Sequence, residues 1–220
     1  MKNKILIVDD HPMTVDSYVN LLSESIFANL NSQFLKCYNA QTAYEKINLT
    51  VQRSEKIDLA LLDISIPPYK NILNGIELAK LIRKKYIHCK IILLTMHSEP
   101  VKVNNIMKEI TPEGFISKSD IDFESFPLIC KKIIEGQIFY SKNIMASQRK
   151  MLEKNINWDK HNDKILLLIS EGVKTINLPD YIPLSMSSIE KRKASMKDQL
   201  LMGRGSDREL IGKAKILGIL

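Results

Sequence analysis

Short apolar segments alternate five times with segments of helical periodicity over the first 135 residues of this 220-residue chain. The clearest apolar segment, Leu59–Leu62, ends at Asp63 and is followed by Pro67. A short apolar run closed by a turn signal is typical of a strand buried on both faces. Alternation of such strands with helices favours a parallel sheet that helices cover on both sides. The sequence therefore predicts an α/β domain over residues 1–136, with strands at 4–8, 34–38, 59–63, 90–94 and 114–116 and helices at 13–25, 40–49, 75–85, 100–109 and 126–135.

Polar side chains follow four of these five strands. Asp9 and Asp10 end the first strand, Asp63 the third, Thr95 the fourth and Lys118 the fifth. A single aspartate in such a place more often caps the next helix, but ligands of parallel sheets bind beyond the carboxyl ends of the strands, where all four ends meet. Clustered carboxylates suit Mg²⁺, while an ammonium and a hydroxyl suit phosphoryl oxygens. These residue types predict phosphoryl transfer, with a carboxylate as the nucleophile.

Four ordered motifs in this part resemble the receiver domain of bacterial two-component response regulators. They are Val8-Asp9-Asp10-His11-Pro12, Leu62-Asp63-Ile64-Ser65-Ile66-Pro67, Leu94-Thr95-Met96-His97 and Gly114-Phe115-Ile116-Ser117-Lys118. The resemblance implies a flavodoxin-like fold with a five-stranded parallel sheet in the order 2-1-3-4-5.

The resemblance also implies a role for each residue of the site. Asp63 would accept a phosphoryl group from a sensor histidine kinase, and Lys118 would pair with that group. Mg²⁺ would be held by Asp9, Asp10, Asp63 and the backbone carbonyl of Ser65, and Thr95 and Phe115 would form a switch. The segment from Pro67 to Asn74, beside the acceptor, is longer than is usual in this family.

The charge is concentrated in the last part of the chain. Residues 1–140 carry a net charge of +1 and residues 141–220 a net charge of +6. We expect a linker at 137–157 and a small all-α domain at 158–220. Its predicted helices are 163–170, 175–181 (capped by Thr175), a longer helix capped by Ser187 or Ser188, and 207–217. A short helix, a turn and a longer basic helix form the helix-turn-helix pattern, which binds double-stranded DNA.

This second part is similar to the LuxR-type helix-turn-helix domain of the NarL/FixJ response regulators, through Glu171–Thr175 and Leu184–Arg192. The resemblance implies a homodimer on DNA. Glu190 stands where the family commonly has a basic residue, and Lys193 where it has an apolar one. The predicted DNA-binding residues are Ser187, Ser188, Lys191, Arg192 and Lys197.

The sequence favours a cytoplasmic, phosphorylation-controlled transcription regulator that is no enzyme beyond assisting its own phosphorylation. Three scattered cysteines form no metal-binding motif, and no apolar run reaches the roughly 20 residues of a membrane span. One alternative is an aspartate-dependent phosphatase or phosphotransferase, although such hydrolases of the haloacid dehalogenase type place a second Asp where this chain has Ser65. Another is a signalling adaptor whose last domain binds protein, which Glu190 keeps open.

Overall fold

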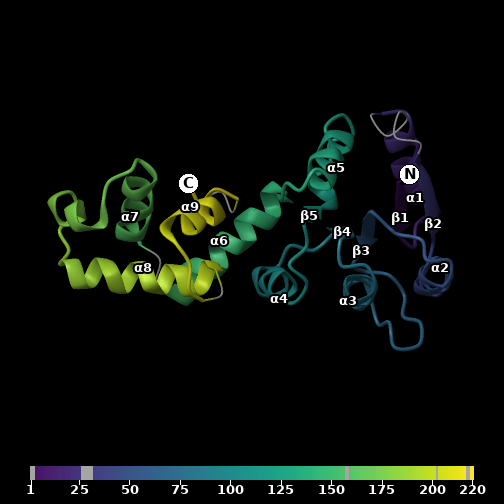
Figure 1. Cartoon of the computed structure of the whole chain (residues 1–220), viewed down its shortest axis with the longest axis horizontal. Coiled ribbons are helices and arrows are strands. Elements are labelled where there is room, and N and C mark those ends of the chain that lie inside the picture. Colours follow the sequence, from purple (N-terminus) through teal and green to yellow (C-terminus); the bar gives the residue numbers. More distant parts are fainter. Residues whose placement is uncertain (1–2, 26–31, 157–158, 202, 217–218) are drawn as a thin grey trace. The chain divides into compact units, whose positions relative to one another are not determined.

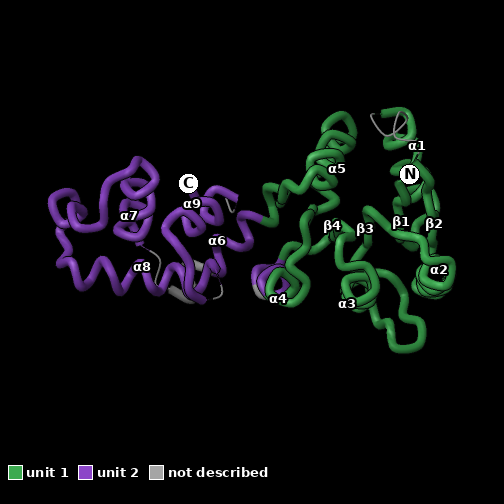
Figure 2. The backbone as a smooth tube through the Cα atoms, in the orientation of Figure 1, with its two compact units in different colours: residues 1–98, 105–144 green, residues 99–104, 145–220 purple. Residues whose placement is uncertain are grey.

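The computed structural model describes residues 3–25, 32–156, 159–201, 203–216 and 219–220. The chain divides into two compact units, which Figure 2 colours separately. Unit 1 comprises residues 1–98 and 105–144, and unit 2 comprises residues 99–104 and 145–220. The first residues of α4 (Pro100–Ile110) and most of α6 (Lys142–Ile156) are thus grouped with the C-terminal part. None of the helices in the described ranges is long and apolar enough to span a membrane.

Unit 1 contains a six-stranded parallel sheet in the order β2-β1-β3-β4-β5-β6. The predicted flavodoxin-like order is confirmed for β1 to β5. Its strands are β1 (Lys4–Val8), β2 (Gln33–Cys37), β3 (Leu59–Asp63), β4 (Lys90–Thr95), β5 (Gly114–Ser117) and β6 (Phe139–Tyr140).

Helices cover both faces of this sheet, with α1 and α5 on one face and α2, α3 and α4 on the other (Figure 1). On the first face, side chains of α1 and α5 pack on alternate strand residues, and the Tyr18 and Phe126 rings lie 5.2 Å apart. Because successive side chains of a strand point to opposite faces, the remaining strand residues, Phe115 among them, lie on the other face. The helices are α1 (Pro12–Ser23), α2 (Ala40–Gln52), α3 (Gly75–Lys85), α4 (Pro100–Ile110) and α5 (Phe126–Ile134), with a 3₁₀ turn, η2 (Lys118–Asp120), after β5.

The sixth strand is the main difference from the expected receiver. Phe139 and Tyr140 pair in parallel with Gly114 and Phe115 of β5. Both residues fall in the predicted linker at 137–157, because a two-residue strand has no periodicity that a pattern can reveal. The strand exists because an exposed edge of the sheet offers unpaired backbone groups to the chain that returns from α5.

The start of α3 fixes the backbone next to the predicted acceptor. Asn74 caps the helix, its side-chain oxygen accepting from the Ile76 and Glu77 amides at 2.9 and 3.1 Å. Gly75 follows, and a Cβ at this position would lie 2.0 Å from the backbone oxygen of Asp63. Only glycine permits so close an approach of helix and strand.

Unit 2 is helical, as predicted. It contains most of α6 (Lys142–Ile156), followed by α7 (Lys160–Ser170), the 3₁₀ helix η3 (Thr175–Asp180), α8 (Met186–Leu201) and α9 (Asp207–Ile216). Its buried apolar side chains include Ile165, Leu178, Ile189, Met196 and Leu210. The predicted domain boundary at 157 and 158, and the end of the last helix at Leu217, lie outside the described residues.

Two predicted helix caps in unit 2 were wrong. Thr175 is the first residue of η3 and not its cap, which is Lys174. The longer helix begins earlier than expected, since Ser185 precedes it and its hydroxyl accepts from the Ser188 amide at 3.3 Å. Several adjacent serines offered equivalent caps in the sequence, and the backbone path of the preceding turn selected among them.

Candidate functional site

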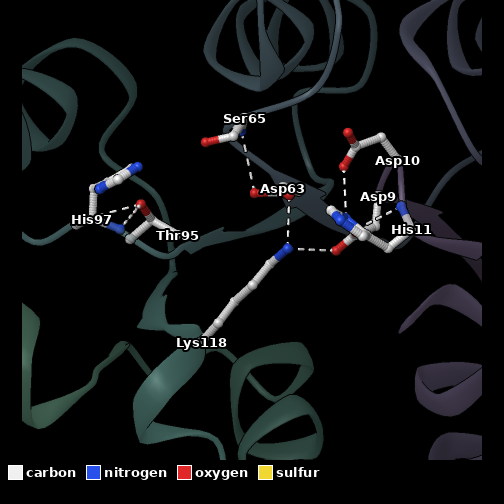
Figure 3. Close-up of polar contacts among 8 residues, drawn as sticks. All are labelled: Asp9, Asp10, His11, Asp63, Ser65, Thr95, His97 and Lys118. Carbon is white, nitrogen blue, oxygen red and sulfur yellow. Dashed lines mark hydrogen bonds and ion pairs between the residues drawn. The ribbon is translucent and has the colours of Figure 1, made fainter. Parts of the chain in front are cut away.

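Lys118 connects the ends of three strands at one edge of the sheet. Its Nζ donates to Oδ2 of Asp9 and to Oδ2 of Asp63, each at 2.7 Å (Figure 3). Neither aspartate is more than 3% exposed. An ammonium between two buried carboxylates offsets the repulsion that would otherwise prevent both from ionising. The predicted convergence of β1, β3 and β5 on one site is therefore present.

Burial and hydrogen bonding act in opposite directions on Lys118. Burial by itself would lower the pKa of this ammonium, but hydrogen bonds to Asp63 and Asp9 outweigh it and raise the pKa above its ordinary value. The same two charges act on a neighbour, Tyr18, whose pKa burial raises first and the carboxylates of Asp9 and Asp63 raise further. The Lys118 ammonium is thus held between two carboxylates, at a site that is largely shielded from solvent.

Asp10 and His11 form the solvent side of the cluster. His11 Nδ1 lies 2.9 Å from Asp10 Oδ1 and 3.2 Å from Asp9 Oδ1, and the His11 amide donates to Asp9 Oδ1 at 3.0 Å. The Asp10 side chain is 30% exposed and that of His11 72% exposed. His11 is not among the predicted site residues, although its position directly after two acids was a signal in the sequence.

The structure also describes the surroundings of the predicted acceptor, Asp63, and of the predicted switch residues, Thr95 and Phe115. The Ser65 amide donates to Asp63 Oδ1 at 3.2 Å, which orients the carboxylate. The Thr95 hydroxyl donates to the His97 carbonyl at 2.9 Å and accepts from the His97 amide at 3.0 Å, as Figure 3 shows. Phe115 is fully buried. In this state the Thr95 hydroxyl is therefore engaged by its own loop.

The donor set fits a small, hard cation. Asp9, Asp10 and His11 can offer ligand atoms that all lie within 4.8 Å of one another. Carboxylate oxygens are the ligands that Mg²⁺ prefers. Asp63 lies next to this cluster, because it shares the Lys118 ammonium with Asp9. Receiver domains in general bind Mg²⁺ at such an acidic site.

In unit 2, some of the predicted DNA-binding side chains are paired with neighbouring residues and others are exposed. The Arg192 guanidinium forms two hydrogen bonds with the Asp159 carboxylate, both 3.0 Å, and one of 2.8 Å with Asn162 Oδ1. Lys197 pairs with Asp207 at 2.7 Å. Lys191 and Ser187 are exposed, and Ser188 is partly exposed and hydrogen-bonded to Ser185. Arg192 and Lys197, two of the predicted DNA-binding residues, are thus already paired with acidic side chains of the same unit.

Lys193 shows how this chain accommodates a charge at an apolar position. It is 8% exposed, and its ammonium donates to Asp207 Oδ2 at 2.6 Å and to the Thr175 hydroxyl at 2.5 Å. Burial opposes ionisation of Asp207, but Lys193 and Lys197 outweigh it and lower the pKa of its carboxyl. The partner, fourteen residues away in α9, could not be identified from sequence spacing.

Comparison with known proteins extends over both units. Residues 5–124 match the family described as the response regulator receiver domain. The transcriptional regulatory protein ComA of Bacillus subtilis is 26% identical over 225 residues, which span 96% of this chain and 97% of ComA. The transcriptional regulatory protein RcsB of Salmonella typhi is 24% identical over 201 residues, 87% of this chain and 85% of that protein.

Solved structures share the fold. A structure of the Salmonella typhimurium RcsB response regulator has a TM-score of 0.56 at 19% identity and covers 97% of this chain and 98% of that one. A second, titled as a complex of the response regulator RcsB with DNA, has a TM-score of 0.55 at 18% identity. Since the receiver match covers more than half of the sequence, and the relatives align with both units, the chain belongs to the two-component response regulators of the NarL/FixJ type.

Proposed function

We propose that Asp63 accepts a phosphoryl group from a sensor histidine kinase, and that this event controls binding of the C-terminal unit to double-stranded DNA. The observation that carries the proposal is the ammonium of Lys118, 2.7 Å from both Asp9 and Asp63. It supports a site in which one buried carboxylate is available as a nucleophile and a cation is in place for the incoming phosphoryl oxygens.

In the proposed reaction, an oxygen of Asp63 attacks the phosphorus in line. The bond from phosphorus to the kinase histidine breaks as the acyl phosphate forms. The Ser65 amide keeps the carboxylate oriented, and Lys118 moves its hydrogen bond from Asp63 to a phosphoryl oxygen while it retains Asp9. Thr95 leaves the His97 carbonyl to donate to the same group, and Phe115 follows the space that the hydroxyl vacates.

Mg²⁺ would be held by the carboxylates of Asp9, Asp10 and Asp63 and the backbone carbonyl of Ser65. When bound, it neutralises charge that develops on the phosphoryl oxygens. Asp9 would then serve both the cation and Lys118, and the two positive charges would together neutralise the phosphoryl oxygens. The chain then assists only its own phosphorylation and dephosphorylation and turns over no other substrate.

Phosphorylation is tested with a small phosphodonor such as a phosphoramidate. The wild-type protein should gain one phosphoryl group, measured by intact mass, and Asp63→Asn should gain none. Asp16→Asn, which alters an exposed aspartate paired with Lys36, is the matched control and should behave as wild type. Uptake by Asp63→Asn equal to that of wild type would refute the acceptor assignment.

One observation favours a second candidate, an adaptor whose C-terminal unit binds protein. The most exposed residues of α8, which lie along one stripe, are Ser187, Glu190, Lys191, Ala194 and Asp198. This stripe carries two acids and one cation, whereas Arg192, Lys193 and Lys197 are paired with acids of the same unit. Because this stripe is not basic, it is less suited to bind DNA phosphates than the net charge of +6 on residues 141–220 suggested.

A titration of DNA at several salt concentrations separates the two candidates. DNA binding through phosphates must weaken steeply as salt rises. Lys191→Ala should weaken it uniformly across sequences and lower the salt slope by about 1, as expected for one lost phosphate contact. Glu190→Ala is the control. It changes the neighbouring exposed residue of the same helix but removes no cation, so it should leave the salt slope unchanged. Absence of DNA binding by the phosphorylated protein at low salt would favour the adaptor.

A further inference from the structure

The turn that carries Lys118 is bound at its other end to the start of α6. Asp120, the last residue of η2, accepts from the Ser141 hydroxyl at 2.7 Å and from the Asn143 backbone amide at 2.8 Å. The Asn143 side chain donates to Asp120 Oδ1 at 2.6 Å and to the Ser119 hydroxyl at 3.2 Å. One carboxylate therefore holds the first turn of a helix that is distant in sequence.

A second set of bonds fastens the same place to the sheet. The Ser141 amide donates to the Phe115 carbonyl at 3.0 Å, and the Ser141 hydroxyl accepts from the Ser117 amide at 2.9 Å. Ser141 is 3% exposed. Together with β6, which pairs with β5, these bonds join the residues just before α6 to the predicted switch residue and to the strand end that leads to Lys118.

The position of Asp120 makes its bonds stronger than ordinary ones. Its carboxylate accepts from an amide at the N-terminus of α6, where the helix dipole and charge-assisted hydrogen bonding both favour a negative charge. A single residue, Ser119, separates Asp120 from Lys118, and a 3₁₀ turn allows little independent movement of its two ends. A displacement of Lys118 is thus a displacement of the group that holds α6.

We propose that Asp120 is a positioning residue for α6, and that Asp120 with Ser141 transmits the movement of Lys118 on phosphorylation to this helix. Residues of α6 from Met145 onward belong to unit 2, so the helix is the covalent route from the receiver to the C-terminal unit. The inference rests on the proposed phosphorylation of Asp63. Coupling between two sites requires contacts that differ between the phosphorylated and unphosphorylated forms. The Asp120 contacts supply this difference, and α6 is the element that phosphorylation shifts.

Hydrogen exchange in the full-length protein tests this proposal. Exchange of the α6 amides is measured by mass spectrometry with and without beryllofluoride, an analogue of the phosphoryl group. In wild type, beryllofluoride should change the exchange of peptides that contain residues 142–151. In Asp120→Ala and in Ser141→Ala this change should be lost. In Asp120→Ala, which removes the acceptor of the Asn143 amide, this amide should also exchange about tenfold faster in both states, as for loss of roughly 1.4 kcal/mol of protection.

The matched control is Asp122→Ala, in the same loop. Asp122 is exposed, and its carboxylate accepts a local bond from the Glu124 amide at 3.0 Å. This variant should show the wild-type response to beryllofluoride. A purely structural role of Asp120 would speed exchange but would leave the difference between the two states intact.

Label uptake from the small phosphodonor separates the two levels of the proposal. Wild type without uptake at Asp63 would refute the proposed function itself. With uptake in wild type, a normal beryllofluoride response of α6 in either Asp120→Ala or Ser141→Ala would overturn the coupling alone. Loss of uptake in both variants would also overturn it, because Asp120 would then serve the chemistry of Lys118 and not the transmission to α6.

Discussion

At the scale of single residues, the site depends on one close backbone contact and on one ammonium shared by two carboxylates. Gly75 lies against the backbone of Asp63, and Lys118 lies between two buried carboxylates. The first contact is steric and the second electrostatic. Each predicts a different response to substitution.

Gly75→Ala should destabilise unit 1. The added Cβ would meet the Asp63 carbonyl oxygen at 2.0 Å, and a backbone atom cannot move aside as a side chain can. We expect a loss of about 3 kcal/mol, the upper range for overpacking, measured by urea unfolding. Gly212→Ala is the control, since a Cβ within α9 meets nothing within 4 Å and should stabilise unit 2 by about 0.5–1 kcal/mol. Equal effects of the two substitutions would contradict the close approach at Gly75.

Lys118 predicts a dependence of stability on alkaline pH. Its pKa is raised in the folded protein, so the folded state retains this proton more tightly than the unfolded chain does. The corresponding stability is present below the ordinary lysine pKa of 10.5 and is lost as pH rises through the higher folded value.

The measurement is the urea midpoint of unit 1 as a function of pH. It should fall above about pH 10.5 in wild type, and less steeply in Lys118→Met. Buried Tyr18, whose pKa is also raised, contributes a similar decline to both proteins and cancels in the comparison. Identical pH profiles of the two proteins would show that the Lys118 bridge is not formed.

At the scale of elements, unit 2 uses charges of its predicted DNA-binding helix to hold neighbouring helices. Asp159 caps α7 through the amides of His161 and Asn162 and also binds Arg192 of α8. Burial opposes ionisation of Asp159, but the Arg192 hydrogen bond and the two amides outweigh it and lower the pKa of its carboxyl. One side chain thus sets both the start of α7 and its attachment to α8.

Asp159→Ala should therefore destabilise unit 2 by about 1–2 kcal/mol, the usual cost of losing an N-cap. Asp159→Asn keeps an oxygen for the cap and should recover most of this loss at neutral pH. The free energy is obtained from urea unfolding followed by circular dichroism. Asp198→Ala, at an exposed position of α8, should change stability by less than about 0.5 kcal/mol. A loss as large in Asp198→Ala would indicate a general charge effect.

At the scale of the whole molecule, the two units have separate cores. Unit 1 packs α1 and α5 on the sheet, and unit 2 buries its own apolar side chains from α7, η3, α8 and α9. Unfolding of chains with separate cores departs from a single two-state transition. The substitutions described above should therefore act on different transitions.

Native-state hydrogen exchange in increasing urea measures the unfolding of each unit separately. Peptides of β3 report on unit 1 and peptides of α7 on unit 2. Gly75→Ala should lower the midpoint for β3 and leave that for α7 within error, and Asp159→Ala should do the reverse. Because effects of distant, independent sites add, the double variant should show both shifts unchanged. A single transition that moves alike in both variants would show that the units unfold as one.

The sequence by itself determined the strand order of β1 to β5, the convergence of Asp9, Asp63 and Lys118, and the helical C-terminal part. The strand order was implied by the resemblance of four motifs to receiver domains, whereas the convergence of strand ends and the helices followed from local apolar periodicity and the topology of parallel sheets. The predicted caps in unit 2 were wrong at Thr175, which is the first residue of η3, and before α8, where several serines were equivalent.

Tertiary structure alone decided the contacts between residues far apart in the chain. The sixth strand needed an open sheet edge, the bond of Asp120 to Asn143 needed the return of the chain beside η2, and the pairing of Lys193 with Asp207 needed α9 beside α8. Hydrogen bonds and ion pairs reach only about 3–4 Å, so the partner of a charge is fixed by the folded path of the backbone and not by its sequence neighbours.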